Sequence, residues 1–461
     1  MDHSGILVIS MMVTFISLLF TGYPIAFILG GVAMLFTLIG YGSDLLFGTI
    51  TGLDYMTIGL LINRLYSVLN NWVLIALPLF IFMGLMLDRS GIAEKMMIAM
   101  QDLFGKARGG LAVSVTLIGI LLAASTGIVG ASVVLLGLLS LPAMLNQGYS
   151  KTLAVGTVCA SGTLGILIPP SIMLVMMADQ LSLSVGDLFM GALLPGILLG
   201  ILYMAYILIF AFIFPHAAPL AKNRQKLEFI MVWRVMKTIF PTAVLILSVL
   251  GSIFAGLATP TEASGIGAMG ATILAVVNKR LSLKVFREVL YNTFNTTGYI
   301  VGILVGATCF ALVLRELGGD EFIAGVFTGL DFGPYGLITT ILAMVFFLGF
   351  FLDWIEITLI ILPIMSPVVS ALGLHFDMGA GVDRPELVWF AILVAVSLQT
   401  SFLTPPVGFA IFYLKGVSPP EISLADICKG VVPFIILQLI GLIICMLWPG
   451  LVLWLPSIAY G

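Results

Sequence analysis

The sequence predicts an all-α polytopic membrane protein: an inverted repeat of about five plus five transmembrane helices, with two re-entrant hairpins and two broken helices. Three observations support this fold class. Of the 461 residues, 61% are hydrophobic and only 9% are charged, whereas soluble domains carry about 25% charged residues. Pro-Pro pairs interrupt two long apolar runs, 236 residues apart. Basic residues are concentrated in alternate loops, which indicates that those loops share one side of a bilayer.

Ten apolar runs are long enough, or nearly so, to cross a membrane as helices. In order they are 6–20, 22–40, 72–88, 152–178, 188–214, 236–256, 260–278, 291–314, 386–414 and 431–454. The first is short and either tilts or merges with the second. It follows an N-terminus without the basic segment of a cleavable signal peptide, so we expect it to be kept as a membrane helix. The more polar stretches 44–70 and 279–294 are typical of interfacial helices.

Two further apolar runs are too long for one crossing and are interrupted in the middle. Residues 109–145 are interrupted by the small and polar segment 124–130, and residues 335–372 are interrupted around Asp353 and Glu356. We expect both to be re-entrant hairpins that enter and leave the bilayer by the same face.

The two broken helices are predicted at the Pro-Pro pairs. Residues 161–170 read SGTLGILIPP and residues 397–406 read SLQTSFLTPP. Pro169, Pro170, Pro405 and Pro406 remove backbone donors and keep the preceding residue out of the helical region. A membrane helix tolerates such a break only where it faces other protein or a water-filled site. Two breaks at matching positions in two halves point to the binding site of a transporter.

The distribution of charge supports this topology. With both hairpins re-entrant, the loops 88–108, 147–151, 215–237, 279–290 and 415–429 lie on one side. They hold all 19 Lys and Arg residues except Arg64, Arg315 and Arg384. The opposite side holds most of the loop acids, namely Asp179, Asp187, Glu316, Asp320, Glu321, Asp377, Asp383 and Glu386. The basic side is expected to be cytoplasmic, with both termini outside.

An internal repeat follows from the same offset. Besides the Pro-Pro pairs, 236 residues separate Pro24 from Pro260, Ser161 from Ser397 and Gly31 from Gly267. We expect a first repeat over 1–235, with scaffold helices within 6–88, hairpin 109–145, broken helix 152–178 and helix 188–214. The second covers 236–461, with scaffold helices within 236–314, hairpin 335–372, broken helix 386–414 and helix 431–454. Since the first half starts outside and the second inside, the repeat is inverted.

Small polar residues gather at the predicted hairpin tips and breaks. Ser125, Thr126 and Gly127 lie at the first tip, and Ser161, Gly162, Thr163 and Gly165 lie at the first break. The second half offers Asp353 at its tip and Thr400, Ser401 and Thr404 at its break. Hydroxyls and freed carbonyls are hard oxygen ligands that suit Na⁺, whereas small polar residues also serve plain helix packing in membranes. The paired clusters favour ion or substrate binding.

The acidic residues in apolar surroundings have more than one interpretation. Asp353 and Glu356 are candidates for a cation ligand, a proton site or a hairpin lock, because carboxylates are costly inside a bilayer. Alternatively, they reach the outer interface or a water-filled vestibule. Glu262 fits a capping box with Thr259 as N-cap, which explains it without any transport role.

Several function classes find no support in the sequence. The chain has no phosphate-binding Gly-rich loop with Lys and neither an HExxH nor a GxSxG motif, so we expect no enzyme. The four cysteines are scattered, without metal-ligand spacing or a disulfide framework. No basic cluster suits nucleic acid. The lipid bilayer is the partner that composition itself predicts.

The motifs at 160–171 (ASGTLGILIPPS), 259–263 (TPTEA) and 403–408 (LTPPVG) give the chain a family resemblance. It resembles the large membrane (M) subunit of tripartite ATP-independent periplasmic (TRAP) transporters over essentially its whole length. The resemblance implies a Na⁺-coupled importer of organic acids in the bacterial inner membrane, with an ion-transporter-superfamily fold and an elevator motion. It also implies a small four-helix membrane (Q) subunit and a periplasmic substrate-binding protein (P) as partners.

Carried onto this sequence, the resemblance implies two Na⁺ regions. Residues 125–127 with 161–163 would form the first, and Asp353 with Thr400, Ser401 and Thr404 would contribute to the second. The substrate would lie between them, near Ser125, Thr163, Gly165, Thr400 and Thr404. The second hairpin tip, Asp353-Trp-Ile-Glu356, is bulkier and more acidic than the family's commoner form and resembles a branch associated with 2-oxo acids and other monocarboxylates.

Two other functions stay open on the sequence alone. A self-sufficient Na⁺/carboxylate symporter of the related fold would transport without a binding protein. A structural or channel-like scaffold would give a Na⁺-independent, non-saturating flux.

Overall fold

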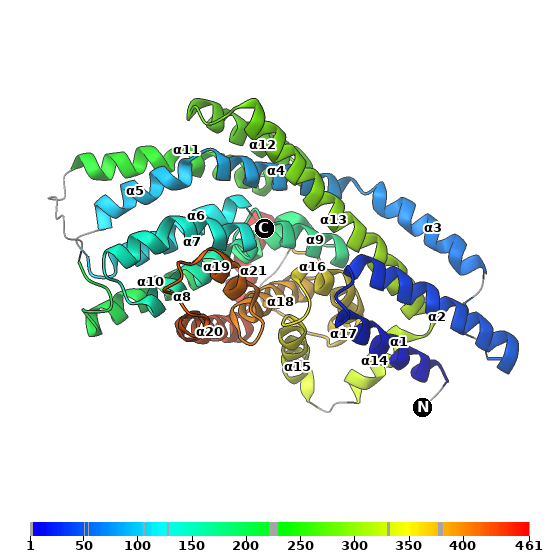
Figure 1. Cartoon of the computed structure of the whole chain (residues 1–461). Helices are drawn as coiled ribbons and strands as arrows, with labels where there is room; N and C mark the ends of the chain where they lie inside the picture. The colour runs from blue at the N-terminus through cyan, green and yellow to red at the C-terminus, as the bar shows by residue number, and fades with distance from the viewer. Residues whose placement is uncertain are drawn as a thin grey trace. The chain divides into compact units, whose positions relative to one another are not determined.

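The computed structural model describes residues 3–49, 51–53, 55–104, 107–126, 129–220, 229–329, 332–376 and 381–460. Every regular element in these ranges is a helix (Figure 1). Ten helical segments are long and apolar enough to cross a membrane, by length and composition. The predicted all-helical, multi-pass class is therefore confirmed.

The helices follow one another along the chain. Up to the first broken helix they are α1 (His3–Leu19), α2 (Ile25–Phe47), α3 (Tyr55–Leu69), α4 (Ala76–Arg89), α5 (Ile92–Phe104), α6 (Gly110–Thr126), α7 (Val129–Asn146), α8 (Lys151–Thr163) and α9 (Ile172–Leu181). They continue as α10 (Val185–Ile213), α11 (Phe229–Phe254), α12 (Pro260–Val277), α13 (Leu283–Glu316), α14 (Gly319–Thr328) and α15 (Gly333–Leu348). The last are α16 (Trp354–Glu356), α17 (Leu362–Ala371), α18 (Pro385–Leu403), α19 (Phe409–Val417), α20 (Leu424–Leu447) and α21 (Gly450–Tyr460).

The chain forms two compact units that cut across the two sequence halves. The first unit comprises residues 1–72, 294–341 and 352–374. The second comprises 73–293, 342–351 and 375–461. In the first unit α1 packs on α2 and α14, and the rings of Phe15 and Phe310 lie 5.1 Å apart. The second unit is the larger and contains both Pro-Pro pairs.

At the centre of the second unit lies α18. All its residues from Leu387 to Leu403 are buried. Its sequence carries no charge after Glu386, which is typical of a helix packed on every side. The indole N–H of Trp389 donates to the carbonyl oxygen of Cys445 at 2.9 Å, so α20 holds this helix through a backbone acceptor.

Glycines allow α8 and α20 to approach closely. A Cβ atom added to Gly156 would lie 2.1 Å from the carbonyl oxygen of Gly430, and one added to Gly430 would lie 2.3 Å from that of Thr152. Small residues serve such backbone contacts in membrane helices. The contact fixes the first broken helix against α20.

Several predicted elements have counterparts in the structure. The helix 152–178 is interrupted between α8 and α9, and the helix 386–414 between α18 and α19. In the first predicted hairpin, α6 and α7 pack against each other, with the tip residues 127–128 outside the described ranges. Thr259 and Glu262 form the predicted capping box at the start of α12. Ser423 and Asp426 form another at the start of α20.

Two segments that were predicted as loops are partly helical. The stretch 88–108 contains α5, and Asp320 and Glu321 form the first turn of α14. Along α5 the residues Ile92, Met96 and Met100 are buried at helical spacing. A search for runs of about 20 apolar residues misses helices that bury only one face.

Three further boundaries differ from prediction. Residues 283–294 are not a separate interfacial helix, because they continue without interruption into α13. The helix predicted over 431–454 ends at Leu447 and restarts at Gly450, since the residue before Pro449 is disfavoured in a helix. Asp187 lies buried in the first turn of α10 and not in a loop.

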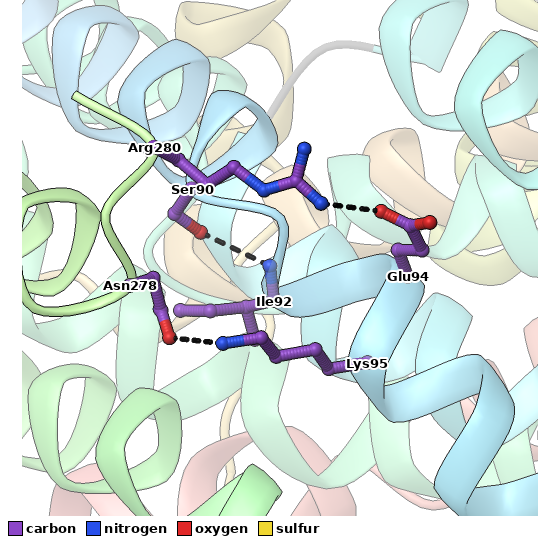
Figure 2. A network of polar contacts seen from close by, with 6 residues as sticks. All are labelled: Ser90, Ile92, Glu94, Lys95, Asn278 and Arg280. Atoms are coloured by element: carbon purple, nitrogen blue, oxygen red, sulfur yellow. Dashed lines mark hydrogen bonds and ion pairs between the residues drawn. The ribbon is translucent and has the colours of Figure 1, made fainter. Parts of the chain in front are cut away.

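Polar contacts connect the α4–α5 corner with the α12–α13 corner of the second unit (Figure 2). Arg280 Nη2 lies 3.0 Å from Glu94 Oε2, and Lys95 Nζ donates to Asn278 Oδ1 at 2.6 Å. The side chains of Arg280 and Glu94 are about half exposed, and such surface pairs contribute little each. They tie the two corners together at the rim of a larger apolar contact between α4 and α12.

Candidate functional site

The first break begins where α8 ends at Thr163. A single 3-10 turn, Leu164–Ile166, follows and contains Gly165. The peptide bond between Pro169 and Pro170 is cis, and the Ser171 hydroxyl donates to the carbonyl oxygen of Ile166 just before α9 begins. Residues 161 to 171 are all buried. The break therefore exposes turn backbone inside the protein.

The first hairpin packs tightly against this break. The Ser161 hydroxyl lies 3.3 Å from that of Thr116 in α6. A Cβ on Gly119 would lie 2.6 Å from that of Ser161, and one on Gly162 would lie 2.4 Å from Val133 Cγ2 in α7. The two arms of the hairpin thus contact adjacent residues of α8.

The predicted residues at the first hairpin tip are located only in part. Ser125 and Thr126 are the last residues of α6. Their side chains and the whole of Gly127 lie outside the described part of the chain. Their predicted contact with Ser161, Gly162 and Thr163 stays a prediction, although α6, α7 and α8 pack together.

The second break repeats this plan. Helix α18 ends at Leu403, Thr404 is extended, and the bond between Pro405 and Pro406 is cis. Thr400 and Ser401 are buried, and Thr404 is half-buried. Their hydroxyls donate to backbone carbonyl oxygens of their own helix, at 2.8 Å in each case. Thr163 does the same towards Ala160. The hydroxyl oxygens keep lone pairs that can accept or coordinate.

The arm of the second hairpin that precedes its tip contacts α18. The Ser397 hydroxyl donates to the carbonyl oxygen of Leu342 in α15 at 3.2 Å. A Cβ on Gly349, just after α15, would lie 2.2 Å from Ser401 Oγ. Asp353 belongs to the other unit, so its predicted partnership with Thr400, Ser401 and Thr404 stays a prediction.

Asp353 and Glu356 stand at the start of the helix that follows the second tip. Asp353 is the N-cap of α16, and its Oδ1 accepts from Trp354 N at 2.8 Å. Glu356 is fully buried, and within the described residues neither carboxyl oxygen has a hydrogen-bond partner. The Tyr299 hydroxyl lies beside this carboxyl. A π-helical turn, Ile357–Ile361, follows, and such turns are frequent at functional sites.

One polar cluster was missed at the sequence level. Gln438 Nε2 donates to the Tyr203 hydroxyl at 2.7 Å and to Thr163 Oγ1 at 3.4 Å, and Gln399 Nε2 donates to the same Tyr203 hydroxyl at 3.4 Å. We call these four side chains the glutamine cluster. The signal was available, because Gln438 is a lone amide within an apolar run and Gln399 lies next to Thr400.

A solved structure shares this fold. The crystal structure of the YdaH transporter of Alcanivorax borkumensis superimposes with a TM-score of 0.62, covering 86% of this chain and 90% of that one, at 15% sequence identity. At that identity the likeness shows the fold alone. It agrees with the helical membrane architecture described above.

Relatives of similar sequence are permease proteins of TRAP transporters. The C4-dicarboxylate large permease protein DctM of Pseudomonas aeruginosa is 30% identical, over 86% of this chain and 88% of that protein. The sialic acid large permease protein SiaM of Vibrio cholerae is 27% identical over 97% of each. The isethionate permease protein DctMQ of Oleidesulfovibrio alaskensis is 28% identical over 94% of this chain, which covers 64% of that protein.

The family model for the "Tripartite ATP-independent periplasmic transporter, DctM component" matches residues 12–451, nearly the whole chain. That range includes both hairpins, both breaks and the glutamine cluster. The family is one of transporter permeases and not of enzymes. The chain therefore belongs to the DctM family of large permease subunits of TRAP transporters.

Proposed function

We propose that the chain is the permease subunit of a Na⁺-coupled, binding-protein-dependent secondary importer of organic acids. The observation that carries this proposal is the pair of interrupted helices in a transporter family member. Both α8 and α18 end beside buried hydroxyls. In each case a new helix, α9 or α19, begins after the Pro-Pro pair. Interrupted membrane helices offer backbone groups and helix ends to ions and substrates.

The mechanism that we propose is elevator-type alternating access by an inverted repeat. Two parallels support the repeat. The arm of each hairpin before its tip contacts the following broken helix through a serine, Ser161 with Thr116 and Ser397 with Leu342. A short helix precedes each hairpin, α5 in the first half and α14 in the second. One departure is that α3 and α4 are separate helices, whereas their counterpart α13 is continuous.

Na⁺ suits the donor groups available at the breaks. Hydroxyls and freed carbonyls are hard neutral oxygens, and the chain places no Lys or Arg between 109 and 150, 152 and 178, 335 and 372, or 385 and 414. An anionic substrate would then be held by hydroxyls, by N–H groups at the starts of α9 and α19, and by bound Na⁺.

The substrate class follows from charge. The relatives named above act on C4-dicarboxylates, sialic acid and isethionate, by their descriptions. All three are anions, two carboxylates and one sulfonate. We propose an organic acid as the substrate of this chain, with Asp353, Trp354 and Glu356 favouring a monocarboxylate.

The proposed partners complete a tripartite system in the bacterial inner membrane. The family description calls the transporter tripartite, and one relative is described as a DctMQ permease protein, a name that joins two subunit types. We propose a separate small four-helix Q subunit and a periplasmic P protein for this chain. The basic loops would face the cytoplasm.

Reconstitution tests this function. The permease with its Q and P proteins, in liposomes with an inward Na⁺ gradient, should accumulate one or more members of an organic-acid panel with saturable kinetics. Uptake that persists without the P protein would favour the self-sufficient symporter. A flux that neither saturates nor responds to Na⁺ would favour a channel-like scaffold and refute coupling.

A further inference from the structure

The glutamine cluster joins four helices of the second unit at one point. Thr163 is the last residue of α8, Tyr203 lies in α10, Gln399 in α18 and Gln438 in α20. All four side chains are buried, with exposed fractions of 0%. The Tyr203 hydroxyl oxygen accepts hydrogen bonds from both amides, from Gln438 Nε2 at 2.7 Å and from Gln399 Nε2 at 3.4 Å. The cluster is therefore a single polar centre in an apolar surrounding.

The two glutamines leave their carbonyl oxygens without partners. Oε1 of Gln399 and Oε1 of Gln438 are buried and accept no hydrogen bond within the described residues. In each glutamine, Oε1 is bonded to the same carbon as the Nε2 atom that donates to the Tyr203 hydroxyl. Both oxygens therefore belong to the immediate surroundings of that hydroxyl. An unsatisfied buried acceptor costs free energy that an apolar residue of the same shape would not. Two such acceptors in one buried cluster call for a ligand.

The surrounding electrostatics favour a positive ligand. Thr163 is the C-terminal residue of α8, and Gln399 lies about one turn before the end of α18 at Leu403. The C-terminal end of a helix carries partial negative charge from its unpaired carbonyls. Amide and hydroxyl oxygens are hard neutral ligands, which suit a cation that is bound and released again in each cycle.

A purely structural role explains less. Interhelical hydrogen bonds from Gln438 Nε2 to Tyr203 and Thr163 would hold α8, α10 and α20 together. That role uses the amide nitrogens and leaves both oxygens unexplained. A cation between the two oxygens would use the atoms that packing does not.

We propose that Gln399 and Gln438, supported by the oxygens of Thr163 and Tyr203, form a Na⁺ site in the second unit. It shares Thr163 with the first predicted Na⁺ region, but its two amide ligands, Gln399 and Gln438, belong to neither predicted region. The proposal rests on the proposed Na⁺ coupling, and it adds a coupling ion held between the ends of the two broken helices.

Binding of radioactive Na⁺ to the purified full-length chain in lipid nanodiscs tests this site. Gln438→Met and Gln399→Met keep the side-chain length and remove the oxygen. Each should reduce the affinity of one class of bound Na⁺ by about fivefold or more, the effect of losing one polar ligand. Gln438→Glu retains an oxygen at the same place and should bind Na⁺ at least as tightly as the native protein.

The matched control is Gln147→Met. That amide lies outside the cluster and donates to the carbonyl oxygen of Pro219 at 3.1 Å. Its Na⁺ binding should equal that of the native protein. Folding of every variant is checked by size-exclusion chromatography and thermal unfolding.

The outcomes separate this inference from the proposed function. Folded Met variants that bind Na⁺ like the native protein would show that the cluster only packs helices. If the Met variants do not fold, the Gln438→Glu variant tests the site instead. Weaker Na⁺ binding by that variant than by the native protein would overturn the site. A native protein that binds no Na⁺ would refute the site and the coupling together, whereas native binding with unaffected variants refutes the site alone.

Discussion

Gly156 in α8 and Gly430 in α20 face each other so closely that a methyl group on Gly156 would lie 2.1 Å from the Gly430 carbonyl oxygen. The neighbour is backbone, so no side-chain rotation can make room. The residues on either side of Gly156 are buried as well. The contact therefore sets the distance between the first broken helix and α20, which carries Gln438.

Gly156→Ala should destabilise the protein by about 1–3 kcal/mol, because overpacking forces backbone shifts. A lower midpoint of thermal unfolding in detergent would show this. The matched control is Gly265→Ala in α12, where nothing lies within 4 Å of an added Cβ. That change should leave the midpoint unchanged or raise it, since alanine is the better helix former. Equal midpoints for both variants would contradict the close approach.

Long apolar segments and proline breaks were predictable because each depends on local chemistry. Proline acts on its own residue and the one before it, so the ends of α8 and α18 could be placed from the sequence. Helices α5 and α14 were not found, because a helix with one buried face lacks a continuous apolar run.

The predicted hydroxyl residues were placed at the breaks, but their partners could not be predicted. Ser161 meets Thr116, and Thr163 meets Gln438, across sequence separations of 45 and 275 residues. Such pairs are fixed by tertiary packing, which no local pattern reports. For the same reason the glutamine cluster was missed, although each glutamine taken alone was a visible anomaly.

Thr404→Ala should raise the Na⁺ concentration for half-maximal uptake on the order of fivefold, the effect of losing one neutral oxygen ligand. Thr126→Ala should act in the same direction at the first predicted site. Thr272→Ala is the control, because Thr272 makes the same bond to its own helix, 2.8 Å to Ala268 O, far from either break in the sequence. An unchanged Na⁺ dependence in both test variants at normal expression would remove the ion-site assignment.

Glu356→Gln should lower uptake without lowering the midpoint of thermal unfolding. The native carboxyl is buried with neither oxygen hydrogen-bonded in the described residues, so neutralising it removes a desolvation cost. A residue kept at such a cost in a membrane is expected to serve transport. Uptake and unfolding are measured on the same preparations.

Glu262→Gln gives the opposite expectation and serves as the comparison. Glu262 is exposed and accepts the Thr259 backbone N–H at 2.8 Å in a capping box. Weakening that box should lower the midpoint of thermal unfolding slightly and leave uptake per folded molecule intact. If Glu356→Gln behaved like Glu262→Gln, the carboxyl would be structural.

Single cysteines should report the orientation that the charges predict. Lys284→Cys lies on the basic side and Asp383→Cys on the acidic side, and both positions are exposed. A membrane-impermeant maleimide added to spheroplasts should label the Asp383 variant at once, and the Lys284 variant only after lysis, because basic loops stay cytoplasmic. Cys159, Cys309 and Cys445 are buried, so replacing the partly exposed Cys428 by serine lowers the background. Labelling of both variants from the outside would place an odd number of crossings in one hairpin and refute the inverted repeat.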